Sequence, residues 1–206
     1  MSKENPYHLR KMVAQQAARM IAEDGIADFA YAKKKAGRQL GVIEGNALPS
    51  NAEIEEEIRL YHSLFLAEVH PEHLRELRHN ALFTMQLLER FNPHLTGAVL
   101  DGTAGVLAET HLYLYADSIK EVEMFLLNQQ IPFEVNERSY RVVNDGKRDK
   151  RADLRKKVPM FILQTDAGPI KLSVFDIDDI RVPIKHAVSG ENADKLNIEG
   201  LKALLG

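Results

Sequence analysis

The chain has 206 residues, 45% of them hydrophobic, and a formal net charge of −3 at pH 7. This is the composition of an ordinary globular protein, and the small acidic charge argues against non-specific nucleic-acid binding by the whole chain. The chain has no cysteine, which excludes disulfide bonds, thiolate zinc sites and a cysteine nucleophile. The polar N-terminal stretch and the lack of an apolar run of about 18 residues predict a cytoplasmic protein without a membrane span.

The first 95 residues predict four helices. Apolar residues recur at helical spacing over residues 9–21, and a second amphipathic segment runs over residues 28–41. The motif Ser50-Asn51-Ala52-Glu53 predicts a capping box at the start of a third helix. Pro71 lies in the first turn of a fourth helix, where its missing N–H costs no hydrogen bond. We therefore predict an N-terminal helical domain over residues 1–95.

From Gly97 onward the pattern changes to short strands and helices. Strands are predicted over residues 98–100 and 112–115, and Ser118 predicts the start of a helix. Residues 160–163 and 170–175 flank a turn sequence, which predicts a β-hairpin. We therefore predict an α+β fold, with a mixed sheet and flanking helices in a C-terminal domain over residues 96–206.

The segment from residue 99 to residue 115 carries the pattern that points most directly to chemistry. Gly102 and Thr103 follow a predicted strand, and a turn of small residues there can present backbone N–H groups to a phosphate. Glu109 and His111 are two residues apart on a predicted strand, so both face the same side and can share a divalent cation. Mg²⁺ prefers oxygen ligands, whereas imidazole is better suited to Mn²⁺ or Zn²⁺. The alternative is a glycine-rich turn between two strands, with Glu109 and His111 at a sheet edge.

Two further segments offer groups to such a site. A basic segment over residues 147–157 can bind phosphate or RNA, or it is a solvated loop. Its leading candidates for nucleotide binding are Lys147, Arg148, Lys150 and Arg151. Three acidic residues follow the last clear strand: Asp176, Asp178 and Asp179. They can supply the third carboxylate that a two-metal site requires, with Asp176 as the leading candidate, or they form a solubilising acidic turn.

Histidines are concentrated in the third and fourth predicted helices, at positions 62, 70, 73 and 79. They do not follow the spacing of a helical zinc motif. We therefore expect surface histidines without a metal site.

Over nearly its full length the chain resembles a family of uncharacterised bacterial proteins. Members of that family are labelled sometimes nucleotidyltransferases and sometimes UDP-N-acetylmuramate–alanine ligases. The resemblance rests on residues 17–25 (AARMIAEDG), 32–36 (AKKKA), 48–51 (LPSN) and 100–104 (LDGTA). The ligase label requires a Gly-Lys-Thr phosphate loop, which this sequence lacks.

Residues 97–176 also resemble the nucleotidyltransferase superfamily. The resemblance implies that Gly102 and Thr103 hold the phosphates of a nucleoside triphosphate (NTP) and that Glu109 is the first metal-binding carboxylate. It places His111 where the superfamily has a second acidic residue. The implied cofactor is Mg²⁺ or Mn²⁺, and the missing second acid predicts little or no turnover.

Three hypotheses follow. The first is a nucleotide- or partner-binding domain with little or no turnover, which can form a homodimer through the helical domain. The second is an active metal-dependent nucleotidyltransferase that uses an NTP, with Glu109 and Asp176 as its catalytic carboxylates. The third, less expected from the charge, is RNA binding through residues 147–157.

Overall fold

A computed structural model describes residues 6–26, 28–42, 48–67, 69–142, 154–185 and 192–206. The chain forms two compact units. The first, the helical unit, contains residues 1–73 and 102–108, and the second, the sheet unit, contains residues 74–101 and 109–206. The helices and the mixed sheet confirm the predicted α+β fold. The boundary between the two units falls between residues 73 and 74, within the fourth predicted helix, and residues 102–108 return to the first unit. The boundary predicted between residues 95 and 96 divides the chain at a different place.

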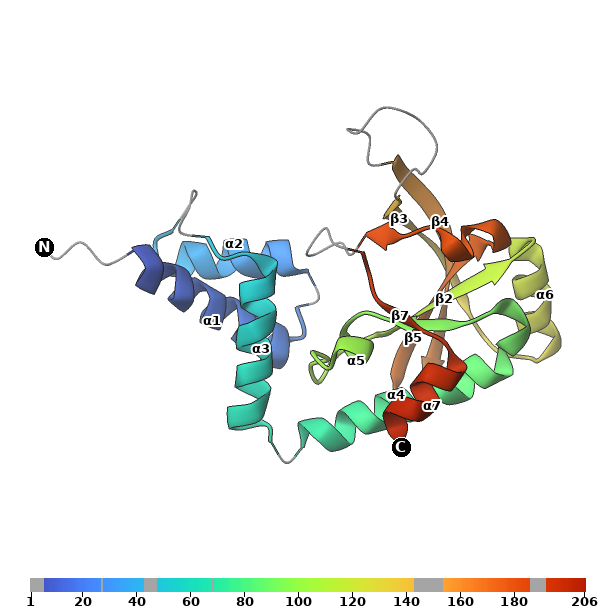
Figure 1. Ribbon diagram of the computed structural model, residues 1–206, viewed down its shortest axis with the longest axis horizontal. Helices are drawn as coiled ribbons and strands as arrows, with labels where there is room; N and C mark the ends of the chain where they lie inside the picture. Colours follow the sequence, from blue (N-terminus) through green and yellow to red (C-terminus); the bar gives the residue numbers. More distant parts are fainter. Residues whose placement is uncertain (1–5, 27, 43–47, 68, 143–153, 186–191) are drawn as a thin grey trace, which may run out of the picture. The chain divides into compact units, whose positions relative to one another are not determined.

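The helical unit contains the first three predicted helices: α1 (Pro6–Asp24), α2 (Phe29–Gln39) and α3 (Asn51–Phe65) (Figure 1). Their apolar stripes meet in one core, as the helical periodicity requires. The core is rich in alanine, and small side chains allow α1 to approach the other two helices closely. Its fully buried members include Val13, Ala17, Ala32, Ala36, Ile54 and Ile58.

The start of α3 confirms the predicted capping box. The Ser50 side chain accepts a hydrogen bond from the Glu53 backbone, and the Glu53 carboxylate accepts one from the Ser50 backbone. Arg10 of α1 forms an ion pair with the same carboxylate, and its Nη2 atom lies 2.7 Å from Oε2 of Glu53. The hydrogen bond from Arg10 is the main reason why the pKa of Glu53 falls to about 2. One carboxylate thus fixes both the start of α3 and its contact with α1.

The sheet unit contains seven short strands and three longer helices among its described residues. α4 (His70–Leu87) crosses into it from the helical unit, and two short 3₁₀ turns lie at Glu89–Phe91 and Ile177–Arg181. The other elements are β1 (His94–Thr96), α5 (Ala98–Asp101), β2 (Thr110–Ala116), α6 (Ile119–Asn128), β3 (Glu134–Val142), β4 (Leu154–Thr165), β5 (Gly168–Asp176), β6 (Ile184–Lys185), β7 (Lys195–Leu196) and α7 (Ile198–Leu205).

The strands form one mixed sheet in the order β6-β3-β4-β5-β2-β1-β7. Only β2 and β5 run parallel, and they pair from Thr110 with Ile170 to Ala116 with Asp176. The predicted hairpin is confirmed: β4 and β5 are antiparallel and close at Thr165 and Gly168. Gly168 has a φ of +106°, a conformation that favours glycine at such a turn.

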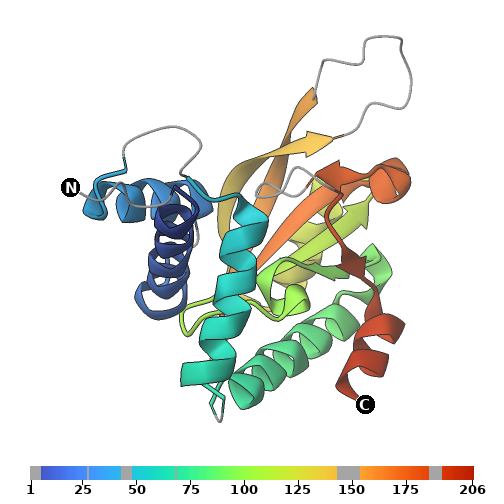
Figure 2. The ribbon, with the colours of Figure 1, turned by 60° about the vertical axis from the view of Figure 1, so that its left-hand side comes forward.

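Alternation along β2 and β5 divides the sheet into two faces. One face is apolar, and its residues Leu112, Leu114 and Leu172 are fully buried. The helices α4, α6 and α7 lie beside the sheet (Figure 2). Leu126 of α6 and Leu201 of α7 are fully buried. The opposite face carries aromatic and polar side chains, and it is the face that concerns function.

In the described part of the chain, no helix combines the length and the apolar character needed to cross a bilayer.

The strand predicted over residues 98–100 is wrong. The strand is β1, four residues earlier, and residues 98–101 form the short helix α5. A short apolar run does not distinguish a strand from a buried helical turn, and Gly97, with a φ of +74°, makes the transition between them. Arg78 of α4 donates hydrogen bonds to the carbonyl oxygens of Val99 and Leu100, at 3.0 and 2.9 Å. These carbonyls are thereby satisfied without a neighbouring strand.

Replacement of Ser50 by alanine tests the cap of α3. We expect Ser50→Ala to lower the free energy of unfolding of the helical unit by about 1 kcal/mol, because the Glu53 backbone N–H loses its acceptor. Chemical denaturation followed by circular dichroism measures the change. Ser63→Ala is the control, since exposed Ser63 lies near the other end of α3 and bonds only within its own helix. An equal loss in both variants contradicts the capping role.

Candidate functional site

The polar and aromatic face of the sheet begins with paired residues of β2 and β5. His111 is paired with Lys171, and Tyr113 is paired with Ser173. On the other side of β2, His111 is paired with Thr96 of β1. These residues share one face because they lie in register on neighbouring strands.

The sheet is curled so strongly that side chains of β3 reach across one strand to β5 and across two strands to β2. The Tyr140 hydroxyl lies 2.6 Å from the Ser173 hydroxyl. The Tyr140 ring meets the Tyr113 ring edge to face, with centroids 5.6 Å apart. Farther along the same strand, Nη1 of Arg138 lies 3.4 Å from Nδ1 of His111. These contacts enclose the middle of the face, and Ser173 is 1% exposed.

Glu109 lies just before β2 and forms an ion pair with Lys171 of β5. The two charged atoms, Oε2 of Glu109 and Nζ of Lys171, are 2.5 Å apart. The side chains are 32% and 20% exposed, respectively. A pair this shielded is screened less than a surface pair. The carboxylate predicted to bind a metal therefore already has a cationic partner.

His111 lies between the two cations of this site. Its pKa is lowered to about 4, first because burial disfavours the imidazolium ion and then because Arg138 and Lys171 repel it. Glu109 acts in the opposite direction, but the first three effects dominate. His111 is therefore neutral at pH 7. We refer to Glu109, His111, Arg138 and Lys171 as the charged cluster.

Gly97 brings a stretch of bare backbone to this cluster. A Cβ atom placed on Gly97 would lie 3.9 Å from Cδ2 of His111. With its positive φ, Gly97 turns the chain from β1 into α5, and Arg78 holds α5 in place. The turn of small residues predicted to face the site at positions 102–103 therefore has a counterpart five residues earlier.

The structure separates the residues that the sequence predicts to act together. Glu109 and His111 lie beside each other in the sheet unit, whereas Gly102 and Thr103 belong to the helical unit. Glu109 precedes the first residue of β2, whereas Asp176 is paired with its last residue, Ala116. At about 3.3 Å per residue, the two ends of the strand are about 20 Å apart. Since a metal ion binds carboxylate oxygens at about 2 Å, Glu109 and Asp176 do not share one ion.

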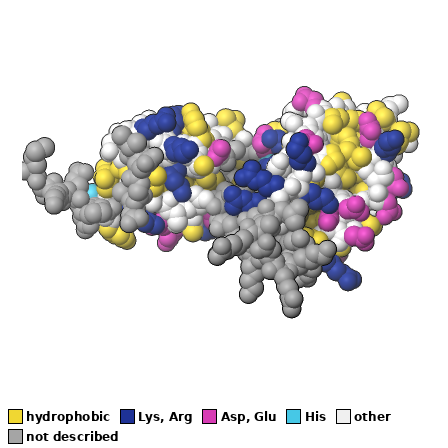
Figure 3. All heavy atoms as spheres, turned by 90° about the horizontal axis from the view of Figure 1, so that it is seen from above, with side chains coloured by type: hydrophobic (Ala, Val, Ile, Leu, Met, Phe, Trp, Pro, Cys, Tyr) yellow, Lys and Arg dark blue, Asp and Glu magenta, His cyan; other side chains and the backbone are white. Residues whose placement is uncertain are grey.

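The predicted basic segment is only partly described. Lys147, Arg148, Lys150 and Arg151 lie outside the described residues. The following residues, 155–157, are not in a loop but on β4, where they pair with β3. Lys156 forms an ion pair with Asp179, and Lys157 forms one with Glu137. On the face of the sheet unit that is visible in Figure 3, acidic and basic side chains are interspersed.

The expectation of surface histidines is wrong for His62, which is buried in the helical unit. It lies on α3 on the same side as Ile54 and Ile58, so its helical spacing is that of a core residue. Within the described residues, no group of three or more histidine, aspartate or glutamate side chains is arranged to hold a metal ion.

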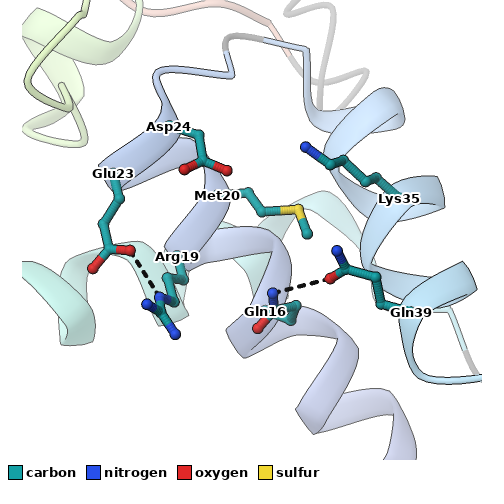
Figure 4. A pocket seen from close by; sticks show the side chains of 7 residues that line it. All are labelled: Gln16, Arg19, Met20, Glu23, Asp24, Lys35 and Gln39. Atoms are coloured by element: carbon teal, nitrogen blue, oxygen red, sulfur yellow. Dashed lines mark hydrogen bonds and ion pairs between the residues drawn. The ribbon is translucent and has the colours of Figure 1, made fainter.

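The helical unit also has a polar surface pocket, lined by residues of α1 and α2 (Figure 4). Its side chains pair with one another: Nε of Arg19 lies 2.8 Å from the Glu23 carboxylate, and the Gln16 amide donates to Gln39. The lining shows no unsatisfied buried group that would call for a ligand.

Comparison with protein-family models, with curated proteins and with solved structures finds no match. The functional argument therefore rests on the charged cluster itself.

Sequence reasoning finds Glu109 and His111 and misses Gly97, Arg138 and Lys171. The alternation of β5 places Lys171 on the same face as the buried residues Ser173 and Phe175, so a charge stands on an otherwise buried face. No pattern in the sequence around Arg138 distinguishes it from other exposed arginines, because only the curl of the sheet brings it close to His111.

Removal of the Arg138 charge tests the electrostatics of the cluster. We expect Arg138→Gln to raise the pKa of His111 from about 4 towards its ordinary value, because one of the two repelling cations is lost. Imidazole NMR signals recorded during a pH titration measure this shift. Lys157→Gln is the control, since Lys157 is paired with Glu137 and does not contribute to the shift of His111. An unchanged His111 in Arg138→Gln contradicts the contact.

Proposed function

We propose that this chain is a nucleotidyltransferase-like protein that binds a nucleotide, or another phosphorylated ligand, with little or no turnover. The observation that carries the proposal is the placement of Arg138 and Lys171 around the Glu109–His111 pair. In an active metal-dependent site, a divalent cation lies at the position of such a pair.

The charges of the cluster favour an anion over a cation. With His111 neutral, Arg138 and Lys171 contribute two positive charges against the single negative charge of Glu109. A divalent cation would have to displace Lys171 from Glu109 and approach the guanidinium of Arg138. A phosphate group, in contrast, could accept hydrogen bonds from both the planar guanidinium of Arg138 and the compact ammonium of Lys171.

The backbone supports the same assignment. Gly97 has no side chain where it approaches His111, so a ligand can come close to the main chain there. The neutral His111 ring offers one N–H donor without adding a further charge. These features fit a bound phosphate and supply no base–metal pair for nucleotidyl transfer.

The ligand and its dependence on metal are tested together by calorimetric titration with ATP, GTP and tripolyphosphate. We expect at least one of these to bind in the presence of EDTA. Arg138→Gln should weaken that binding by about tenfold or more, because a charge-assisted hydrogen bond contributes roughly 1.5–3 kcal/mol. Glu109→Gln should strengthen it, because Lys171 is released from its ion pair.

The sign of the Glu109 effect separates the two leading hypotheses. If Glu109 holds a catalytic metal, Glu109→Gln abolishes binding that requires Mg²⁺ or Mn²⁺. Metal-dependent binding that is lost in Glu109→Gln, or no binding of any of the three ligands, contradicts our proposal. Lys157→Gln is again the control, since it removes an exposed charge of the same sheet. It should leave the affinity unchanged.

Partner binding through the helical unit is a second part of the proposal. Leu64 and Phe65, which are neighbours in the chain near the end of α3, are 65% and 68% exposed and together place apolar surface on the helical unit. We propose that this surface forms a homodimer. Sedimentation equilibrium should show a dimer that is weakened by Leu64→Ser combined with Phe65→Ser. The same change at exposed Phe83 of α4 should have no effect, and a monomer at all concentrations contradicts the proposal.

A further inference from the structure

His62 is a buried histidine whose two ring nitrogens have no hydrogen-bond partner among the described residues. The side chain is 4% exposed. Most buried polar atoms in proteins are hydrogen-bonded, so an imidazole with both nitrogens unsatisfied requires an explanation. Its position costs stability, and a leucine would fill the space without that cost.

His62 stacks on a second histidine. The ring of His70, in the first turn of α4, lies 3.8 Å from the His62 ring between centroids and is tilted by 27°. Nε2 of His70 lies 3.0 Å from the carbonyl oxygen of Ala104. A carbonyl only accepts, so neutral His70 carries its proton on Nε2. The stacked pair thereby connects α3, the start of α4 and the segment of residues 102–108, all within the helical unit.

The segment 102–108 is otherwise held by close approach to α1. A Cβ atom on Gly105 would lie 3.0 Å from the carbonyl oxygen of Ile21, so only glycine fits comfortably. Leu107 packs in the same way against Gly25. Thr103 and Ala104 are buried. The hydrogen bond from His70 to Ala104 links this segment to α4.

Burial and His70 lower the pKa of His62, and no carboxylate among the described residues offsets them. α4 contributes His73, whose Nε2 is buried without a partner. α1 contributes Glu23 and Arg19, which bond to each other, and Glu23 also accepts from Tyr61. Arg59 of α3 is exposed, and residues 102–108 contain no titratable side chain. Glu68, between α3 and α4, lies outside the described residues.

We propose that His62, stacked on His70, forms an acid-sensitive latch, which holds the segment 102–108 when the His62 ring is neutral and releases it when that ring is protonated. Among the described residues, protonated His62 has no acceptor for its additional proton, and His70 opposes its positive charge. Protonation is therefore favoured only in an open state, in which the rings separate and reach water.

The direction of the pH dependence follows from the open state. Burial, and then the proximity of His70, lower the pKa of His62 to about 4 in the closed state. In an open state the ring titrates near its ordinary value of about 6.5. The closed state is therefore fully favoured above about pH 6.5, and its population declines as the pH falls towards 4. Over this range the open population should rise by about two orders of magnitude.

Hydrogen–deuterium exchange of peptides that cover residues 102–108 tests the latch between pH 7 and pH 4.5. The rates are compared with those of His62→Leu at each pH, so the intrinsic pH dependence of exchange cancels. We expect wild type to exchange at least about tenfold faster than His62→Leu at pH 4.5, and the difference to shrink at pH 7. A constant ratio overturns the proposal.

Three further variants make the result specific. His62→Gln is neutral at every pH and should behave as His62→Leu does, so the test does not depend on one variant folding well. His79→Gln removes an exposed histidine of α4 and should behave as wild type. Glu68→Gln should also retain the acid response, and loss of the response in this variant overturns the proposal. A folded-state His62 that titrates near 6.5 by NMR overturns it as well.

Discussion

The curl of the sheet is the constraint on which the site depends. Tyr140 and Arg138 belong to β3, which is separated from β2 by two strands, and yet they reach Ser173 and His111. A flat sheet would leave these side chains far apart, each facing solvent. The edge-to-face packing of Tyr140 on Tyr113 and the buried Tyr140–Ser173 hydrogen bond stabilise the curl. The same curvature brings a guanidinium to the neutral imidazole of His111, so the folding of the sheet and the charge of the site are determined together.

Elements that depend on local chemistry are predictable from the sequence. The capping box at Ser50, the helical stripes of the first two helices and the turn between β4 and β5 each follow from residues close in the chain. The strand predicted over residues 98–100 fails for a reason that is not local. The carbonyls of that segment bond to Arg78, about twenty residues earlier, and an apolar run of this length contains no sign of such a partner.

The site shows the same division. Glu109 and His111 are visible in the sequence because alternation along a strand places them on one side. Their neighbours are not visible, since Lys171 is supplied by strand pairing and Arg138 by the curl. The predicted partner Asp176 fails for the same reason, because the parallel register of β2 and β5 places it at the far end of the pair. His62 differs again: its spacing from Ile54 and Ile58 is that of a core residue, but its polarity indicates a surface residue.

A carboxylate and a histidine two residues apart do not by themselves define a metal site, because the sign of the surrounding charge decides what they bind. If the neighbours are acidic, the local potential attracts a divalent cation and holds the imidazole ready as a ligand. In this protein the neighbours are Arg138 and Lys171, so the carboxylate is already neutralised and the imidazole is kept uncharged. The charges around Glu109 and His111 therefore favour an anion over a divalent cation at this position, which is the premise of the phosphate binding that we propose. The same carboxylate–histidine pair with acidic neighbours would support the opposite proposal, so the strand spacing alone does not decide between them.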